Sequence, residues 1–125
     1  MNIKKQNNKP EEEVRRFIIN YLIRNFKYDK SLFRIEQKIS ENTSERSFRP
    51  DVIVYDNNYN PFLIIECKAR NINITEETVF QIQKYNKFLN SKYLLITNGL
   101  KIFCWKLNGN TYIKSEIPYF QKGDN

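Results

Sequence analysis

The spacing of apolar residues near the start of the chain predicts a helix. Pro10 suits a first helical turn, and the glutamates at 11–13 complement the positive end of the helix dipole. Apolar residues then recur every three or four positions, at Val14, Phe17, Ile18, Tyr21 and Leu22. We therefore expect a helix from residue 10 to about residue 25 or 26 that packs one stripe onto a sheet, preceded by a disordered lead over residues 1–9.

Three strands are predicted to follow this helix. Residues 32–39 alternate imperfectly between apolar and polar, residues 52–55 are β-branched or aromatic, and residues 62–67 are almost continuously apolar. A polar turn is expected at 41–47, and Asp56, Asn57 and Asn58 end the second strand. Because a strand without polar alternation is usually covered on both faces, we expect helices on each side of the sheet.

The second half predicts one more helix and a three-stranded meander. Thr75 can cap a helix that runs to about residue 89, with Ile82, Tyr85 and Leu89 facing inward. Strands are then expected at 94–97, at 101–105 and from 111, because Asn-Gly pairs at 98–99 and 108–109 favour hairpin turns. The tail over 118–125 is predicted to be irregular.

These elements predict one α/β domain over residues 10–117, with a mixed central sheet flanked by helices. The expected order is αβββαβ, followed by the remaining strands of the C-terminal β-meander. The 125 residues and 15.2 kDa suit a single domain.

Composition narrows the chemistry. The chain has 21 lysines and arginines against 14 acidic residues, a formal charge of +7 that favours a polyanion such as nucleic acid, unless it only reflects a Lys- and Asn-rich composition. With no histidine, Ser-His and Cys-His catalysis and histidine metal sites are excluded. Cys67 and Cys104 lie in apolar runs without a CxxC spacing, so buried free thiols are expected. No signal-peptide or membrane-spanning run is evident, which predicts a cytoplasmic protein.

The candidate chemistry lies in Asp51, Glu66 and Lys68. If the strands at 52–55 and 62–67 form a hairpin, these three residues lie at its open end, and Glu66 and Lys68 share a face opposite Cys67. Two neighbouring carboxylates repel unless a cation lies between them, so Mg²⁺ or Mn²⁺ is expected, with the Cys67 carbonyl as a third ligand. Lys68 could orient or help deprotonate the attacking water. The alternative is a buried Asp51–Lys68 salt bridge with Glu66 incidental.

This arrangement resembles the PD-(D/E)XK nuclease superfamily, including the proline before Asp51. Five motifs also occur in order along the chain: Pro10-Glu11-Glu12 with Val14-Arg15, Arg49-Pro50-Asp51, Glu66-Cys67-Lys68, Gln81 with Tyr85-Asn86, and Thr97-Asn98-Gly99. In these motifs, from about Pro10 to Trp105, the chain more narrowly resembles the N-terminal nuclease domain of type I restriction enzyme R subunits. The resemblance implies a restriction-endonuclease-like core and a Mg²⁺-dependent endonuclease acting on DNA, with Asp51 and Glu66 as ligands and Lys68 as the catalytic lysine.

Three further residues, Gln81, Tyr85 and Glu11, are open to more than one interpretation. Gln81 and Tyr85 resemble the Q-x-x-x-Y element of that family, in which Gln81 could bind a DNA phosphate or the lysine; otherwise they are a surface glutamine and a core tyrosine. Glu11 lies on the apolar stripe of its helix and can point toward the metal, or it is an ordinary first-turn acid.

The chain also departs from the family, because it contains no GxxxxGK[ST] phosphate loop and is too short for a helicase motor. ATP-driven translocation is therefore not expected of it. DNA targeting would come from a separate subunit or from the domain itself, and the oligomeric state stays open. The competing interpretations are a catalytically idle nucleic-acid-binding module and an interaction subunit of a restriction or defence complex. Candidate DNA contacts, besides Gln81 and Tyr85, are Arg15, Arg49, Lys84 and Lys87.

Overall fold

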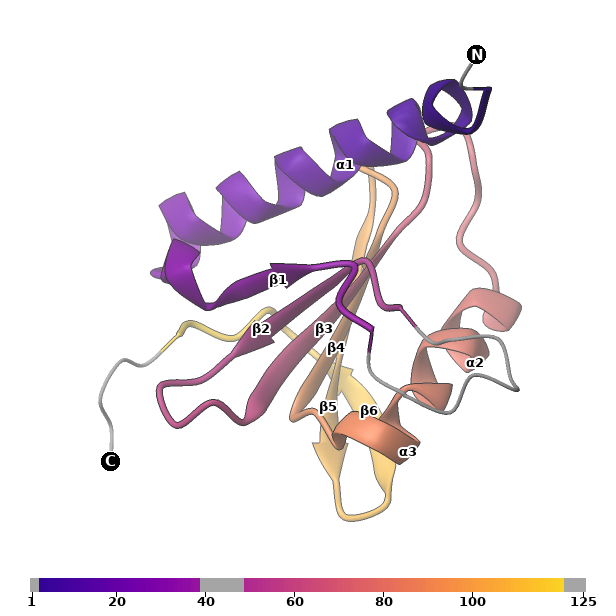
Figure 1. Ribbon diagram of the computed structural model, residues 1–125. Coiled ribbons are helices and arrows are strands. Elements are labelled where there is room, and N and C mark those ends of the chain that lie inside the picture. Colours follow the sequence, from indigo (N-terminus) through magenta and orange to yellow (C-terminus); the bar gives the residue numbers. More distant parts are fainter. Residues whose placement is uncertain (1–2, 39–48, 121–125) are drawn as a thin grey trace.

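The protein folds around a six-stranded sheet that has helices on both faces (Figure 1). The computed structural model describes residues 3–38 and 49–120. The helices are α1 (Ile3–Phe26), α2 (Glu76–Lys84) and α3 (Asn86–Leu89), with a short 3-10 helix, η1 (Lys30–Leu32). The strands are β1 (Phe33–Ile35), β2 (Val52–Tyr55), β3 (Pro61–Cys67), β4 (Tyr93–Thr97), β5 (Ile102–Asn108) and β6 (Thr111–Ser115).

The strands follow one another across the sheet in chain order from β1 to β6. All neighbours are antiparallel except β3 and β4, which are parallel, so the sheet is mixed as predicted. The predicted hairpin of β2 and β3 is present, with Val52 opposite Ile65. Its turn is stabilised by the Asp56 carboxylate, which accepts hydrogen bonds from the amides of Asn58 and Asn60. The predicted meander of β4, β5 and β6 is also present.

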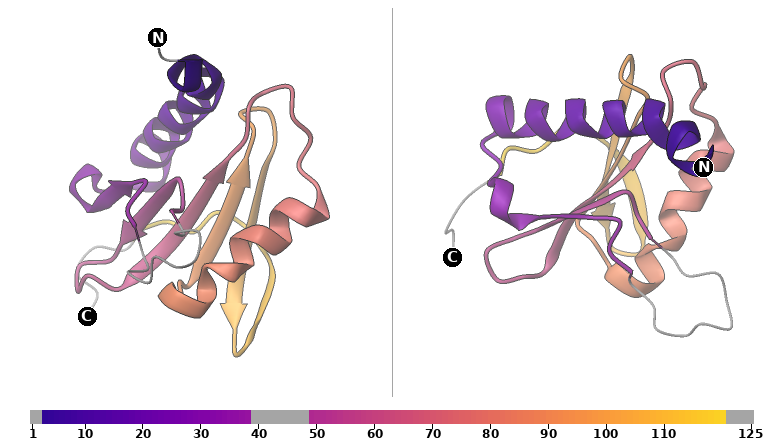
Figure 2. Two further views of the ribbon diagram at one scale, coloured as in Figure 1. Left: turned by 45° about the vertical axis from the view of Figure 1, so that its right-hand side comes forward. Right: turned by 45° about the horizontal axis from the view of Figure 1, so that its top comes forward.

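Helices α1 and α2 lie on opposite faces of the sheet (Figure 2), and an apolar cluster of buried side chains fills the space on each face. Alternate residues of a strand point to opposite faces, so β3 contributes to both clusters. This confirms the prediction that helices cover both faces. The α1 cluster includes Ile18, Leu22, Val52, Val54, Leu63, Ile65 and Cys67, and the α2 cluster includes Ile64, Ile82, Tyr85, Leu94 and Ile96.

The first helix is longer than predicted. It begins at Ile3, so Pro10 lies inside α1, and residues 3–9 are helical where a disordered lead was expected. Residues 1–9 have no apolar stripe, and proline is favoured in the first turn of a helix. A proline inside a helix removes one backbone hydrogen bond and crowds the preceding turn, so the helix continues through Pro10 at a cost in stability.

The first strand is shorter than predicted. Leu32 belongs to η1, β1 covers only Phe33–Ile35, and Glu36 follows with a left-handed backbone (φ 53°). Because β strands require φ near −120°, this conformation ends the strand where residue alternation alone suggested that it continued to 39. The turn predicted at 41–47 lies outside the described residues.

The second helix is divided at Tyr85 into α2 and α3, whereas one helix to residue 89 was expected. Thr75 caps α2 as predicted, its side chain accepting a hydrogen bond from the Thr78 amide. Both cysteines are free and buried, as predicted. Over residues 3–38 and 49–120, no helix is both long and apolar enough to span a membrane.

The packed domain extends past residue 117. Residues 118–120 have no regular secondary structure, but Phe120 is 5% exposed and belongs to the α1 cluster. Its amide donates to the Phe26 carbonyl at 2.9 Å. The start of the predicted tail is therefore anchored to the end of α1, because burying an aromatic ring removes a large apolar area from water.

Candidate functional site

Asp51 lies immediately before β2, at the open end of the β2–β3 hairpin. Its Oδ2 accepts a hydrogen bond from the Cys67 amide at 2.6 Å, and its carbonyl accepts one from the Glu36 amide at 3.0 Å. These two bonds tie Asp51 to the strand on each side. Its carboxylate is thus held at the end of β3 rather than being free in solvent.

Glu66 lies near the end of β3 and is only 8% exposed. Since Cys67 packs in the α1 cluster, the alternation of β3 places Glu66 on the opposite face, which α2 covers. Its Oε1 is buried and has no hydrogen-bond partner among the described residues. A buried acceptor without a partner costs free energy, so Glu66 is not explained as a stabilising residue.

Lys68 directly follows β3 and is half-buried. Its amide donates to the Thr97 carbonyl at 2.9 Å, which fixes its backbone against the end of β4. Lys68 and Asp51 are both described, and no ion pair joins their side chains, so the salt bridge of the alternative interpretation is not present. The ammonium nevertheless lies close enough to lower the pKa of both Asp51 and Glu66.

The two carboxyl groups hold protons unusually strongly. Burial raises the pKa of Asp51 from 3.8 to about 6, although the hydrogen bond from the Cys67 amide opposes this. Burial and the nearby Asp51 charge raise the pKa of Glu66 from 4.5 to about 8. Such an acidic pair favours a protonated carboxyl group or a cation between the carboxylates.

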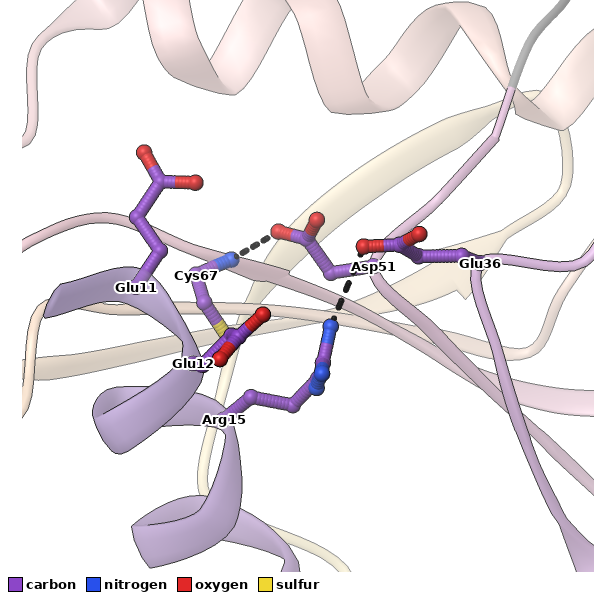
Figure 3. Close-up of a pocket in the computed structure, with 6 residues that line it drawn as sticks. All are labelled: Glu11, Glu12, Arg15, Glu36, Asp51 and Cys67. Carbon is purple, nitrogen blue, oxygen red and sulfur yellow. Dashed lines mark hydrogen bonds and ion pairs between the residues drawn. The ribbon is translucent and has the colours of Figure 1, made fainter. Parts of the chain in front are cut away.

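A pocket of about 70 Å³ opens beside Asp51, between α1 and the ends of β1, β2 and β3 (Figure 3). The charge of Glu11 raises the pKa of both Asp51 and Glu66, so α1 brings this glutamate near the acidic pair. Within the part of the chain that the structure describes, no group of three or more Cys, Asp and Glu side chains has a geometry that would hold a metal ion. The pocket is lined by Glu11, Glu12, Arg15, Glu36, Asp51 and Cys67.

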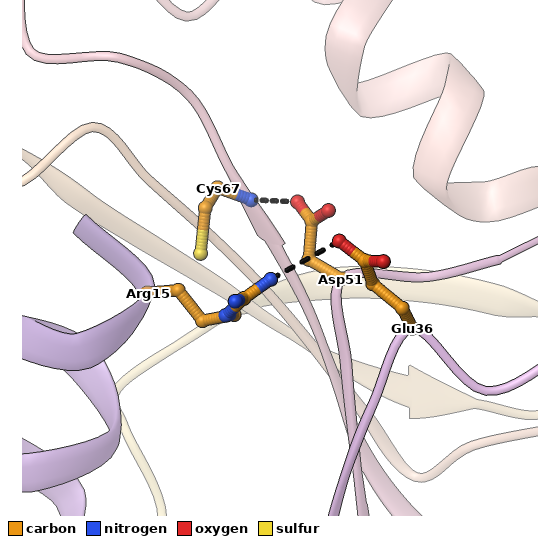
Figure 4. Close-up of polar contacts among 4 residues, drawn as sticks. All are labelled: Arg15, Glu36, Asp51 and Cys67. Carbon is orange, nitrogen blue, oxygen red and sulfur yellow. Dashed lines mark hydrogen bonds and ion pairs between the residues drawn. The ribbon is translucent and has the colours of Figure 1, made fainter. Parts of the chain in front are cut away.

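An ion pair closes one side of this pocket. Arg15 Nη1 donates to Glu36 Oε2 at 3.1 Å, and the two side chains are 20% and 56% exposed (Figure 4). The Arg15 guanidinium thus faces Glu36 in the pocket, and its contact with DNA stays a prediction. Glu36 was not among the predicted site residues. No local motif marks it; only the pairing of β1 with β2 brings it opposite Asp51.

The Thr97-Asn98-Gly99 segment supports the chain around Lys68. The Thr97 hydroxyl accepts from the Gly99 amide at 3.0 Å, and the Asn98 amide nitrogen donates to the Ile72 carbonyl at 2.9 Å. The Asn98 Oδ1 also accepts from the amides of Leu100 and Lys101. These contacts connect the β4–β5 turn to the loop that follows β3.

The remaining predicted residues lie on or near α2. Tyr85 is 6% exposed and packs in the α2 cluster, where the charges of Glu66 and Asp51 help to raise its pKa. Gln81, Lys84 and Arg49 are exposed to solvent. The Lys87 side chain lies outside the described part of the structure.

The mixed sheet has helices on both faces and charged residues gathered where β2 begins and β3 ends, and these features define an α/β domain. A similar fold occurs in the solved structure of the type IIG restriction endonuclease BpuSI, with a TM-score of 0.51 and 17% sequence identity. The match covers 88% of this chain and 12% of that chain. No relative was found among curated proteins.

Residues 10–119 match the family described as Type I restriction enzyme R protein N terminus (HSDR_N). The chain therefore belongs to this family. The match confirms the resemblance inferred from the sequence motifs, and it assigns the chain to restriction-related, nuclease-like domains.

Proposed function

We propose that this domain is a Mg²⁺- or Mn²⁺-dependent deoxyribonuclease with a PD-(D/E)XK site. The observation that carries the proposal is the pair of acidic residues at the end of β2 and β3. Burial raises the pKa of both acids, the charge of Asp51 raises that of Glu66 further, and Glu66 Oε1 has no hydrogen-bond partner among the described residues. Perturbed acids with an adjacent lysine are a common feature of active sites.

The donor set suits a hard divalent cation. Asp51 and Glu66 would supply carboxylate oxygens and Cys67 its backbone carbonyl, while water would complete the coordination that Mg²⁺ prefers. Glu11 is a further candidate ligand because its charge acts on both acids. A bound cation would supply Lewis-acid polarisation of a phosphodiester and would acidify water in the site.

Lys68 would act on the substrate side of the same site. Its backbone is fixed by the hydrogen bond to Thr97, and in the described structure its ammonium forms no ion pair with the acidic residues. A lysine held in this way can orient a water molecule and offset the negative charge that develops on a phosphate in the transition state.

DNA is the proposed substrate. The family and the BpuSI fold are both restriction-related, and the formal charge of +7 favours a polyanion. Exposed Arg49, Gln81 and Lys84 are proposed to contact phosphates beside the acidic residues. Other subunits of a restriction or defence complex are proposed as partners, acting in the cytoplasm.

The test compares cleavage of plasmid and single-stranded DNA with Mg²⁺, with Mn²⁺ and with EDTA. Lys68→Ala should retain cation and DNA binding but lose cleavage by roughly 100-fold or more, as is usual for a positioned acid-base or electrostatic group. Asp51→Ala should instead weaken the cation site itself, so excess Mn²⁺ should restore part of its activity.

Lys92→Ala is the matched control, because Lys92 is an exposed lysine that precedes β4 and lies outside the acidic pocket. Cleavage by Lys68→Ala at the wild-type rate would contradict the mechanism. Binding of DNA by the wild-type protein without cleavage under any cation would instead support a catalytically idle nucleic-acid-binding module.

A further inference from the structure

Arg15 lines the same pocket as two carboxylates, Glu36 and Asp51, but it forms its ion pair with Glu36. All three residues line this pocket, so the guanidinium has both carboxylates near it (Figure 3). Over residues 3–38 and 49–120, however, the only carboxylate within ion-pair distance of Arg15 is Glu36, at 3.1 Å. The Asp51 carboxylate turns toward the Cys67 amide instead (Figure 4).

This choice of partner is unexpected from burial alone. Glu36 is 56% exposed, whereas Asp51 is more deeply buried, and an ion pair is usually stronger where water is excluded. A guanidinium can form two parallel hydrogen bonds with a carboxylate. If Arg15 paired with Asp51 in this way, it would occupy the carboxylate oxygens and place a positive charge where a cation has to bind.

The backbone holds Glu36 in position. Its amide donates to the Asp51 carbonyl at 3.0 Å, so the two residues are linked at the end of the β1–β2 ladder. Its φ of 53° is uncommon for a residue other than glycine. Such a conformation persists only where the surroundings hold it, and here it ends β1 with the Glu36 side chain on the pocket.

We propose that Glu36 is a positioning residue that keeps the Arg15 guanidinium away from the Asp51 carboxylate, so that Asp51 retains an oxygen for a divalent cation. This inference rests on the proposed cation-dependent function. It assigns Arg15 and Glu36 a role in the cation affinity of the site rather than in DNA contact.

Binding of Mn²⁺ in the absence of DNA, measured by electron paramagnetic resonance, tests this role independently of cleavage. Glu36→Gln should weaken Mn²⁺ binding by about tenfold or more, the usual scale for residues that orient a metal ligand, because the released Arg15 can pair with Asp51. Arg15→Gln should bind Mn²⁺ as tightly as the wild type or more tightly, since a positive charge has been removed. The double variant should match Arg15→Gln.

Two further variants separate this role from simpler effects. Glu36→Gly removes the carboxylate and suits the left-handed backbone, so strain cannot explain a weakened site, and it should behave like Glu36→Gln. Glu12→Gln removes a carboxylate from the same pocket without releasing Arg15, so it measures the effect of charge alone.

The outcomes are distinct. One comparison is the loss of Mn²⁺ affinity caused by Glu36→Gln in the wild type and in the Arg15→Gln background. If the loss is the same in both, Glu36 acts only through its own charge and the inference is wrong. A Glu36→Gln variant that binds Mn²⁺ like the wild type would also overturn it. If the wild-type protein binds no Mn²⁺ at all, the proposed function fails first.

Discussion

Replacing Glu66 with glutamine should stabilise the metal-free protein at neutral and alkaline pH. Burial and the Asp51 charge raise the pKa of Glu66 to about 8, against 4.5 for the ordinary group. Between these values the folded chain holds a proton that the unfolded chain has released. The free energy of unfolding therefore falls as the pH rises, by up to ~1.4 kcal/mol per pH unit.

The size of the effect follows from this slope. The wild-type protein should lose a few kcal/mol of stability between pH 5 and pH 8, with Asp51 contributing over the lower part of that range because its pKa rises to about 6. Glutamine cannot ionise, although its amide group has to find partners in the same buried position. Glu66→Gln should therefore gain about 2 kcal/mol at pH 8 and change little near pH 4.5.

Urea unfolding in EDTA, followed by circular dichroism at pH 5, 6.5 and 8, measures this difference. Glu13→Gln is the matched control, because Glu13 is an exposed acid on α1 that should not alter the slope. Mg²⁺ should restore stability to the wild type at pH 8 but less to Glu66→Gln, since a ligand would be missing. If the stability of Glu66→Gln has the same pH dependence as that of the wild type, or if the variant is less stable at pH 8, burial does not raise the pKa of Glu66 in this way.

Three other substitutions or conditions test the fold and the DNA surface. Gly99→Ala should lose about 1–2 kcal/mol of unfolding free energy in urea, because its φ of +90° strains any residue with a Cβ, and wild-type stability would contradict this. Ile18→Ala should lose about 2–5 kcal/mol in the same assay, since Ile18 is a fully buried residue of α1 that packs in the α1 cluster; a smaller loss would mean that the cluster repacks. DNA affinity should fall steeply between low and moderate salt, and Arg49→Gln should reduce that slope; binding that is insensitive to salt would mean that the positive charge is only compositional.

The sequence was sufficient for features that depend on near neighbours. The repeat that includes Ile18 and Leu22 has the period of a helix, and the apolar run before Cys67 has the character of a central strand. The hairpin then follows from the polar turn, and it places Asp51 near Glu66 and Lys68. These patterns are reliable because a few adjacent side chains determine the local backbone conformation and which face is apolar.

The boundaries were less predictable. Residues 3–9 have no apolar stripe, and the alternation of residues continues after Ile35, although β1 ends there and Glu36 has a left-handed backbone. A helix extended through Pro10 and a left-handed residue after a strand both have a local cost in free energy. Local patterns predict the conformation with the lower local free energy, whereas the folded chain adopts the conformation that its long-range contacts stabilise.

Only the tertiary structure determined the environment of the acidic residues. Arg15 and Glu36 are 21 positions apart, and they meet because α1 packs on the sheet while β1 pairs with β2. The raised pKa values of Asp51 and Glu66 likewise arise from burial, which no spacing in the sequence measures. Charge type and periodicity are properties of the chain, but the exclusion of water and the choice of an ion-pair partner depend on which distant segments are brought together.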